Sequence, residues 1–129
     1  MHQDAANHYA RQRIETATPA QLIALLYGAG IAALRAGIDA MGRNDRDEIN
    51  RHMLRAQDVV MELRCSLNPA AGDLAANLDA IYAYSFQRLV RANVGRDTTA
   101  AAEVLGILEG LNESWRAACL TQQPTPAPA

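Results

Sequence analysis

The chain has 129 residues, half of them hydrophobic, and carries 12 basic and 14 acidic side chains for a net charge of −2. This length is sufficient for one domain with a hydrophobic core. The small net charge gives no general attraction to phosphate backbones or anionic lipid surfaces, so it disfavours nucleic-acid binding. Alanine supplies much of the apolar fraction and aromatic residues are few, a composition that favours long, closely packed helices.

Residues 1–17 are polar apart from two isolated apolar anchors, Tyr9 and Ile14. They lack the apolar core of a signal peptide. The apolar run that follows, from Leu22 to Leu34, is shorter than the roughly 20 residues that a membrane span requires. We therefore predict a flexible N-terminal arm, no membrane insertion and a cytosolic location.

A strong helix start follows the arm. Thr18 can cap the free amide groups, Pro19 suits the first helical position, and Gln21 can complete a capping box. The sequence predicts a first helix from this point to about Arg43, where Gly-Arg-Asn-Asp ends it.

Three further helices are predicted over about 45–67, 73–95 and 97–120, each with apolar residues at alternating steps of three and four. Short loops between long helices make neighbours antiparallel, so residues 18–120 are predicted to form an all-α, up-and-down four-helix bundle. Residues 121–129 are rich in proline and are predicted to be a disordered tail. The predicted core positions of the three helices are Ile49, Met53, Ala56, Val60, Leu63 and Leu67; Leu74, Leu78, Ile81, Ser85, Leu89 and Ala92; and Ala101, Val104, Leu108, Leu111, Trp115 and Ala118.

The first helix has more apolar surface than a core contact requires. An ordinary surface helix has an apolar arc of about 100° or somewhat more, and this arc is roughly twice as wide. Either this helix is the most buried of the four, or one of its stripes lines a groove for another chain that the arm covers when the groove is empty. The two stripes are Leu22, Leu26, Ala29, Ala33, Ala36 and Ala40, and Ile23, Tyr27, Ile31, Leu34, Ile38 and Met41.

The sequence offers little chemistry for catalysis or metal binding. His52 and Glu48 do not form the Glu-x-x-His pattern of di-iron bundles, no phosphate loop or nucleophile motif occurs, and Ser85 is expected to bond its own helix backbone. Cys65 and Cys119 lie near the ends of diagonal helices, so we expect free thiols. We predict no enzyme activity, no cofactor and no metal.

Three segments resemble the flagellin-specific flagellar export chaperones, the FliS family. "HYARQRIETATPAQLIALLY" is similar to the family's N-terminal signature, and "INRHMLRAQDVVMELRCSLN" to its second helix. "DLAANLDAIYAYSFQRLVRANVGRD" is similar to its third helix, and Trp115 matches a late tryptophan. One departure is Gly28, where the family usually has an acidic residue.

The resemblance implies a bacterial cytosolic chaperone that binds the disordered C-terminal region of flagellin in a 1:1 complex. It would prevent premature polymerisation and keep flagellin competent for flagellar type III secretion. A flagellar export-gate component and, without the client, a second copy of the chain are further candidate partners. Carried over to this sequence, the arm anchors are Tyr9 and Ile14, the groove residues are Leu22, Ile23, Leu26, Tyr27 and Ile31, and the polar and aromatic contacts are Gln57, Tyr82, Arg88 and Asn93.

The residues also allow a different class of protein. A self-associating helical bundle would use the extra apolar face of the first helix as a homodimer interface and act as a structural or regulatory adaptor. Light scattering of the purified protein separates this alternative from a chaperone.

Overall fold

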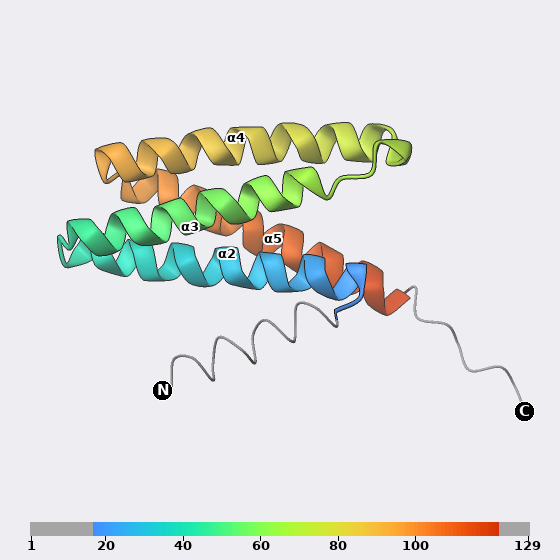
Figure 1. Cartoon of the computed structure of the whole chain (residues 1–129), viewed down its shortest axis with the longest axis horizontal. Coiled ribbons are helices and arrows are strands. Elements are labelled where there is room, and N and C mark those ends of the chain that lie inside the picture. The colour runs from blue at the N-terminus through green and yellow to red at the C-terminus, as the bar shows by residue number, and fades with distance from the viewer. Residues whose placement is uncertain (1–16, 122–129) are drawn as a thin grey trace, which may run out of the picture.

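Long helices make up nearly all of the part of the chain that the computed structural model describes, residues 17–121. Consecutive helices run antiparallel and are joined by short turns (Figure 1), so the predicted up-and-down four-helix bundle is confirmed. The helices are α2 (Pro19–Gly42), α3 (Arg46–Cys65), α4 (Asp73–Gly95) and α5 (Thr98–Thr121), with a short 3-10 helix, η1 (Pro69–Ala71), before α4.

The predicted arm and tail fall almost wholly outside the described residues. Tyr9 and Ile14 lie outside them, as does the tail from residue 122 onward. Thr121, which was expected to begin the tail, is the last residue of α5.

The helix starts follow the predicted capping chemistry. Thr18 Oγ1 accepts a hydrogen bond from the Gln21 amide at 3.1 Å, and Gln21 Oε1 accepts one from the Thr18 amide at 3.0 Å. This reciprocal pair is a complete capping box and fixes where α2 begins. Asp45 caps α3 with a single bond, in which its carboxylate accepts from the Glu48 amide at 3.2 Å.

The helices form a ring in which each packs against two neighbours. α2 packs against α3 and α5, and α4 packs against the same two helices, so α2 and α4 occupy diagonal corners. The centre is a single apolar cluster to which all four helices contribute. Its largest fully buried apolar side chains are Leu34, Ile49, Met53, Leu63, Leu89, Leu108, Val60 and Val104.

The predicted core register of α4 is wrong at the start of the helix. Leu74 was expected in the core, but it is 63% exposed, and Ala75 is buried in its place. One heptad later Tyr82 is buried, whereas the predicted Ile81 is only half-buried. The prediction placed Leu74 and Ile81 in the core because they are the more hydrophobic residues. The small Ala75 and Tyr82 keep the same alternating spacing of three and four residues, and the long Tyr82 side chain reaches across the bundle.

The last turns of α5 also depart from the prediction. Ala118 was assigned to the core but is exposed, and Trp115 is half-buried at the edge of the apolar cluster. The Trp115 indole N–H donates to the Ala20 carbonyl at 3.2 Å, which ties α5 to the first turn of α2. Figure 1 shows α5 diverging from α4 toward this end, so α4 does not cover its last turns.

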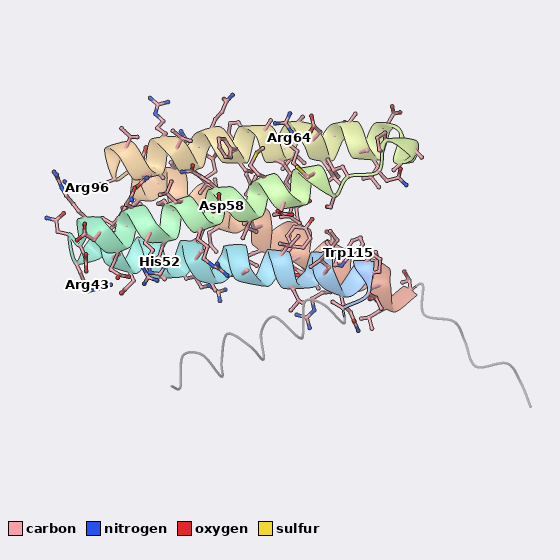
Figure 2. All side chains as sticks on the ribbon, in the orientation of Figure 1. Arg43, His52, Asp58, Arg64, Arg96 and Trp115 are labelled. Carbon is pink, nitrogen blue, oxygen red and sulfur yellow. The ribbon has the colours of Figure 1, made fainter. Side chains whose placement is uncertain are left out.

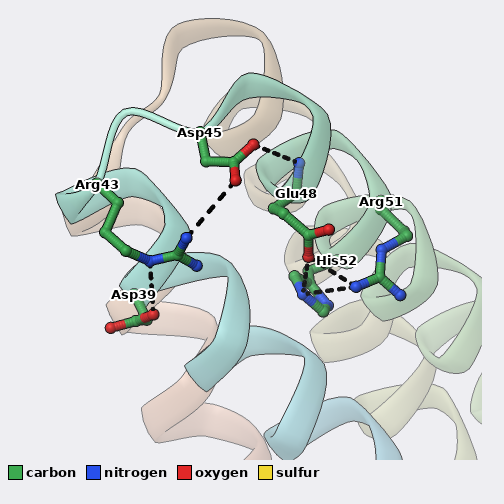
Figure 3. A network of polar contacts seen from close by, with 6 residues as sticks. All are labelled: Asp39, Arg43, Asp45, Glu48, Arg51 and His52. Carbon is green, nitrogen blue, oxygen red and sulfur yellow. Dashed lines mark hydrogen bonds and ion pairs between the residues drawn. The ribbon is translucent and has the colours of Figure 1, made fainter.

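Charged side chains form ion pairs around the turn between α2 and α3 (Figure 3). Arg43 bridges Asp39 at 3.0 Å and Asp45 at 3.5 Å, so one guanidinium joins the end of α2 to the cap of α3. One turn further along α3, Glu48 accepts from Arg51 at 2.6 Å and contacts His52 at 3.0 Å. These contacts hold the end of the bundle where α2 and α3 meet.

α2 is the one described helix that is long and apolar enough to cross a membrane by length and composition. The central helix of a soluble bundle has the same properties, because it is surrounded by neighbours on several sides. Here α2 packs against both α3 and α5, and it carries the charged residues Arg35 and Asp39.

Candidate partner-binding site

The apolar core is covered more completely at one end of the bundle than at the other. At the better covered end, which we call the closed end and where α2 and α4 end, core side chains such as Ile49, Leu89 and Val104 are fully buried. The apolar side chains that remain partly uncovered there include Ile38, Met41 and Val94. At the opposite end, where α2 and α4 begin, apolar side chains of α2, α4, α5 and the segment after α3 are only half-buried. We call these residues the open end: Leu22, Ile23 and Leu26 of α2, Leu67 after α3, Leu78 and Ile81 of α4, and Leu111 and Trp115 of α5.

The open end includes three of the five groove residues that the sequence predicted on the first helix. Leu22, Ile23 and Leu26 are half-buried, so part of each side chain faces solvent. The other two, Tyr27 and Ile31, are buried in the apolar cluster with exposures of 4% and 8%. α2 therefore carries partly covered apolar residues in its first two turns and buried core residues such as Tyr27 and Ile31 beyond them.

A tyrosine pair lies directly beneath the open end. The Tyr27 and Tyr82 hydroxyl groups are hydrogen-bonded at 2.6 Å, which joins the diagonal helices α2 and α4 across the middle of the bundle. Burial raises the pKa of both phenols, so both are neutral across the physiological pH range. The half-buried Ile23 and Leu78 each lie one helical turn nearer the open end than the corresponding tyrosine.

Two further polar side chains are buried in the bundle. Ser85, one turn after Tyr82, is fully buried, and its hydroxyl group has no hydrogen-bond partner among the described residues. The expected bond from Ser85 to its own helix backbone is therefore wrong. Gln57 of α3, a predicted contact residue, is 9% exposed.

The remaining predicted contacts lie elsewhere in the bundle. The Arg88 guanidinium lies 3.4 Å from the Glu103 carboxylate on α5. Asn93 donates to Asn50 at 3.0 Å and lies in the last turn of α4, near the closed end. Of the four predicted polar and aromatic contacts, only Tyr82 therefore bonds to a predicted groove residue.

A shallow pocket of about 410 Å³ adjoins the open end between α2 and α5. Ala20 and Ala24 form its α2 side, and Trp115, Cys119 and Leu120 form its α5 side. Figure 2 shows Trp115 at the end of the bundle where α2 begins. An apolar surface of this kind, rimmed by polar residues such as Gln21 and Arg116, is typical of a contact surface for another polypeptide.

A second hollow runs along the outer junction of α2 and α3, with a volume of about 810 Å³. Its α2 side is made only of alanine, namely Ala29, Ala32, Ala33 and Ala36. Its α3 side is largely polar and includes Arg55 and Asp58. Of the predicted alanine stripe, Ala29 and Ala36 are half-buried beside this hollow, whereas Ala33 is buried.

Sequence reasoning did not predict that several apolar residues of the open end are partly exposed. Leu78, Leu111 and Trp115 were all assigned simply to the core. A useful signal was available, because the predicted topology brings the starts of two helices and the ends of the other two to the same end of the bundle. What the sequence could not give was the divergence of α5, which leaves these side chains partly uncovered.

A helical bundle with an uncovered apolar end has the architecture of a protein that binds other polypeptides. The family model described as "Flagellar protein FliS" matches residues 1–123. The flagellar secretion chaperone FliS of Bacillus subtilis is 31% identical, over 89% of this chain and 86% of its own length. FliSB of Pseudomonas aeruginosa is 34% identical over 80% of this chain and 82% of its own length. FliS of Salmonella typhimurium is 31% identical over 84% of each chain.

The chain belongs to the FliS family, whose members named above are flagellar secretion chaperones. The family expected from the three sequence segments is therefore confirmed.

Proposed function

We propose that this protein is a bacterial cytosolic chaperone that binds the disordered C-terminal region of flagellin in a 1:1 complex. Binding holds the flagellin monomer apart from other monomers until the flagellar type III apparatus exports it. Membership of a family of secretion chaperones supports a flagellar client. The single observation that carries the proposal is the open end, an apolar surface made by α2, α4, α5 and the segment after α3 that the described part of the chain leaves half-covered.

The chemistry of the open end suits an unfolded segment rather than a folded domain. The contact surface is a set of separate half-buried aliphatic and aromatic side chains at the end of a narrow bundle. Short apolar stretches of a disordered chain can insert between such side chains and fold as they bind. Tyr9 and Ile14 remain the proposed anchors by which the chain's own arm covers this surface before the client arrives.

The first test is complex formation. Purified protein mixed with its cognate flagellin monomer at micromolar concentration is expected to give a 1:1 complex in size-exclusion chromatography with light scattering. Flagellin without its C-terminal region is the control and is expected not to bind. Absence of a complex with intact flagellin would contradict the proposal, and a tight dimer that ignores flagellin would favour the self-associating bundle.

The second test places the contact on the molecule. Leu22 is half-exposed at the open end and is not part of the buried cluster, so Leu22→Asp is expected to leave the fold intact. The variant is expected to weaken flagellin binding at least tenfold, because it places a charge in an apolar contact. Val90→Asp is the matched control, because Val90 is 39% exposed on α4 and lies away from the open end. Equal binding by both variants in isothermal titration calorimetry would remove the open end as the contact surface.

A further inference from the structure

The tyrosine pair beneath the open end has one more hydrogen-bond donor than it uses. Each phenol carries one hydroxyl proton, and the 2.6 Å bond between Tyr27 and Tyr82 uses only one of the two. The other proton has no acceptor among residues 17–121, although Tyr27 and Tyr82 are 4% and 2% exposed. A buried hydroxyl proton without an acceptor is unfavourable, so a bound segment that brings an acceptor to it would be stabilised.

The placement of the two tyrosines on their helices indicates the side from which an acceptor would approach. Helical side chains lean toward the N-terminus of their helix. α2 and α4 both begin at the open end, so Tyr27 and Tyr82 both lean toward it. The residues one turn nearer that end, Ile23 and Leu78, are half-buried, and the tyrosine pair therefore lies under a thin, partly open apolar layer.

The surroundings leave the pair available as a neutral donor. Ser85, the polar residue one turn further along α4, has no hydrogen-bond partner either, so it does not take up the spare proton in the described part of the chain. Burial raises the pKa of both phenols, and the proton is present at every physiological pH.

We infer that the Tyr27–Tyr82 pair is a recognition point at the floor of the open end, which donates its spare hydroxyl proton to a main-chain carbonyl oxygen of the bound client. This inference rests on the proposed function. A disordered client has its carbonyl groups free of secondary structure, and each one that becomes buried on binding requires a donor. The aliphatic residues of the open end supply apolar contact, and the tyrosine pair fixes how deep and in which register the segment sits.

The test compares phenylalanine variants that keep the shape of both rings. The double variant Tyr27→Phe/Tyr82→Phe removes the inter-tyrosine bond together with the unsatisfied donor, so its unfolding midpoint is expected to change little. Its affinity for the flagellin C-terminal segment, measured by isothermal titration calorimetry, is expected to fall roughly tenfold, because the client carbonyl is buried without a donor. Each single variant keeps one hydroxyl group and is expected to bind better than the double variant.

Tyr84→Phe is the matched control, because Tyr84 lies on the same helix but is exposed and donates to Glu103 of α5. It is expected to bind flagellin like the natural protein. A folded double variant with unchanged affinity would overturn the inference, and would mean that only water meets the spare proton. A second comparison uses a client whose Asn and Gln side chains are replaced. If the natural protein and the double variant then bind that client equally well, the acceptor is a side chain and the inference is overturned.

If the double variant does not fold, the tyrosine hydroxyl protons of the natural protein provide the readout. Slower exchange of one hydroxyl proton in nuclear magnetic resonance spectra on client binding supports the inference, and unchanged exchange of both overturns it. The proposed function fails separately, since it fails only if the natural protein does not bind flagellin at all.

Discussion

Single residues of α2 show how closely the helices approach one another. A methyl group added at Gly30 would lie 3.0 Å from Leu108 Cδ1 and 3.1 Å from Val59 Cγ1, so three helices meet at a position where only hydrogen fits comfortably. Gly28, two residues earlier, has open space around it. The two glycines look equivalent in the sequence but differ in what surrounds them.

This difference predicts opposite effects of the same substitution. Gly28→Ala is expected to raise the free energy of unfolding by up to about 1 kcal/mol, because alanine favours a helix and nothing opposes the added methyl group. Gly30→Ala has the same gain in helix propensity, but its methyl group crowds the fully buried Leu108 and the stiff, branched side chain of Val59. This crowding is expected to lower the free energy of unfolding by about 1–3 kcal/mol. Urea unfolding followed by circular dichroism measures both. A Gly30→Ala protein as stable as Gly28→Ala would show that the three helices can move apart.

At the scale of the helices, charged pairs connect neighbours on the surface. Arg64 of α3 donates to Asp79 of α4 at 2.6 Å, near the end of α3 (Figure 2 labels Arg64). The hydrogen bond from Arg64 lowers the pKa of the Asp79 carboxyl group below its usual range. Both side chains are well exposed, so solvent and salt weaken the pair.

The Arg64–Asp79 pair predicts a pH-dependent contribution to stability. Because the folded pKa of Asp79 is lowered, the contribution is complete above the unfolded pKa of roughly 3.9 and is lost as the pH falls through the folded value. Asp79→Asn is therefore expected to lower the urea midpoint slightly at pH 7 and to have less effect at pH 3. Asp58→Asn is the control, because Asp58 forms no ion pair with the described residues. An Asp79→Asn effect that is equally large at both pH values would exclude the ion pair as its cause.

At the scale of the whole molecule, the bundle is unevenly packed along its length. The closed end combines fully buried core residues with the charged network around Arg43 and Glu48, shown in Figure 3. The open end has half-buried apolar side chains and is tied across by the Trp115–Ala20 bond. A loosely packed end can adapt to a bound segment without disturbing the core, which suits the binding site proposed there.

Hydrogen exchange measured by mass spectrometry tests this asymmetry. Without client, amide groups in the second and third turns of α2 and the last two turns of α5 are expected to exchange faster than those around Leu89 and Val104, since fewer buried contacts hold them. Addition of the flagellin C-terminal segment is expected to slow exchange at the open end and to leave the closed end unchanged. Uniform protection in the free protein would contradict the uneven packing.

The sequence by itself determined the helices, their order and their antiparallel arrangement. Capping residues such as Thr18 and Asp45 mark where helices start, and spacing of apolar residues at three and four positions gives one buried stripe per helix. These signals are local, so a single chain contains them in full. The family resemblance also followed from residues that are contiguous in the sequence, and the FliS family is confirmed.

Only the tertiary structure decided which apolar residues are covered. Leu74 and Ala75 are neighbours in the sequence, yet the leucine is exposed and the alanine is buried, because the choice depends on where α4 meets the other helices. The Tyr27–Tyr82 bond joins two diagonal helices, and the two residues are 55 positions apart in the sequence. No local spacing of residues encodes such a contact. The open end has the same origin, since it results from the divergence of α5 from α4, and helix axes are set by the packing of all four helices together.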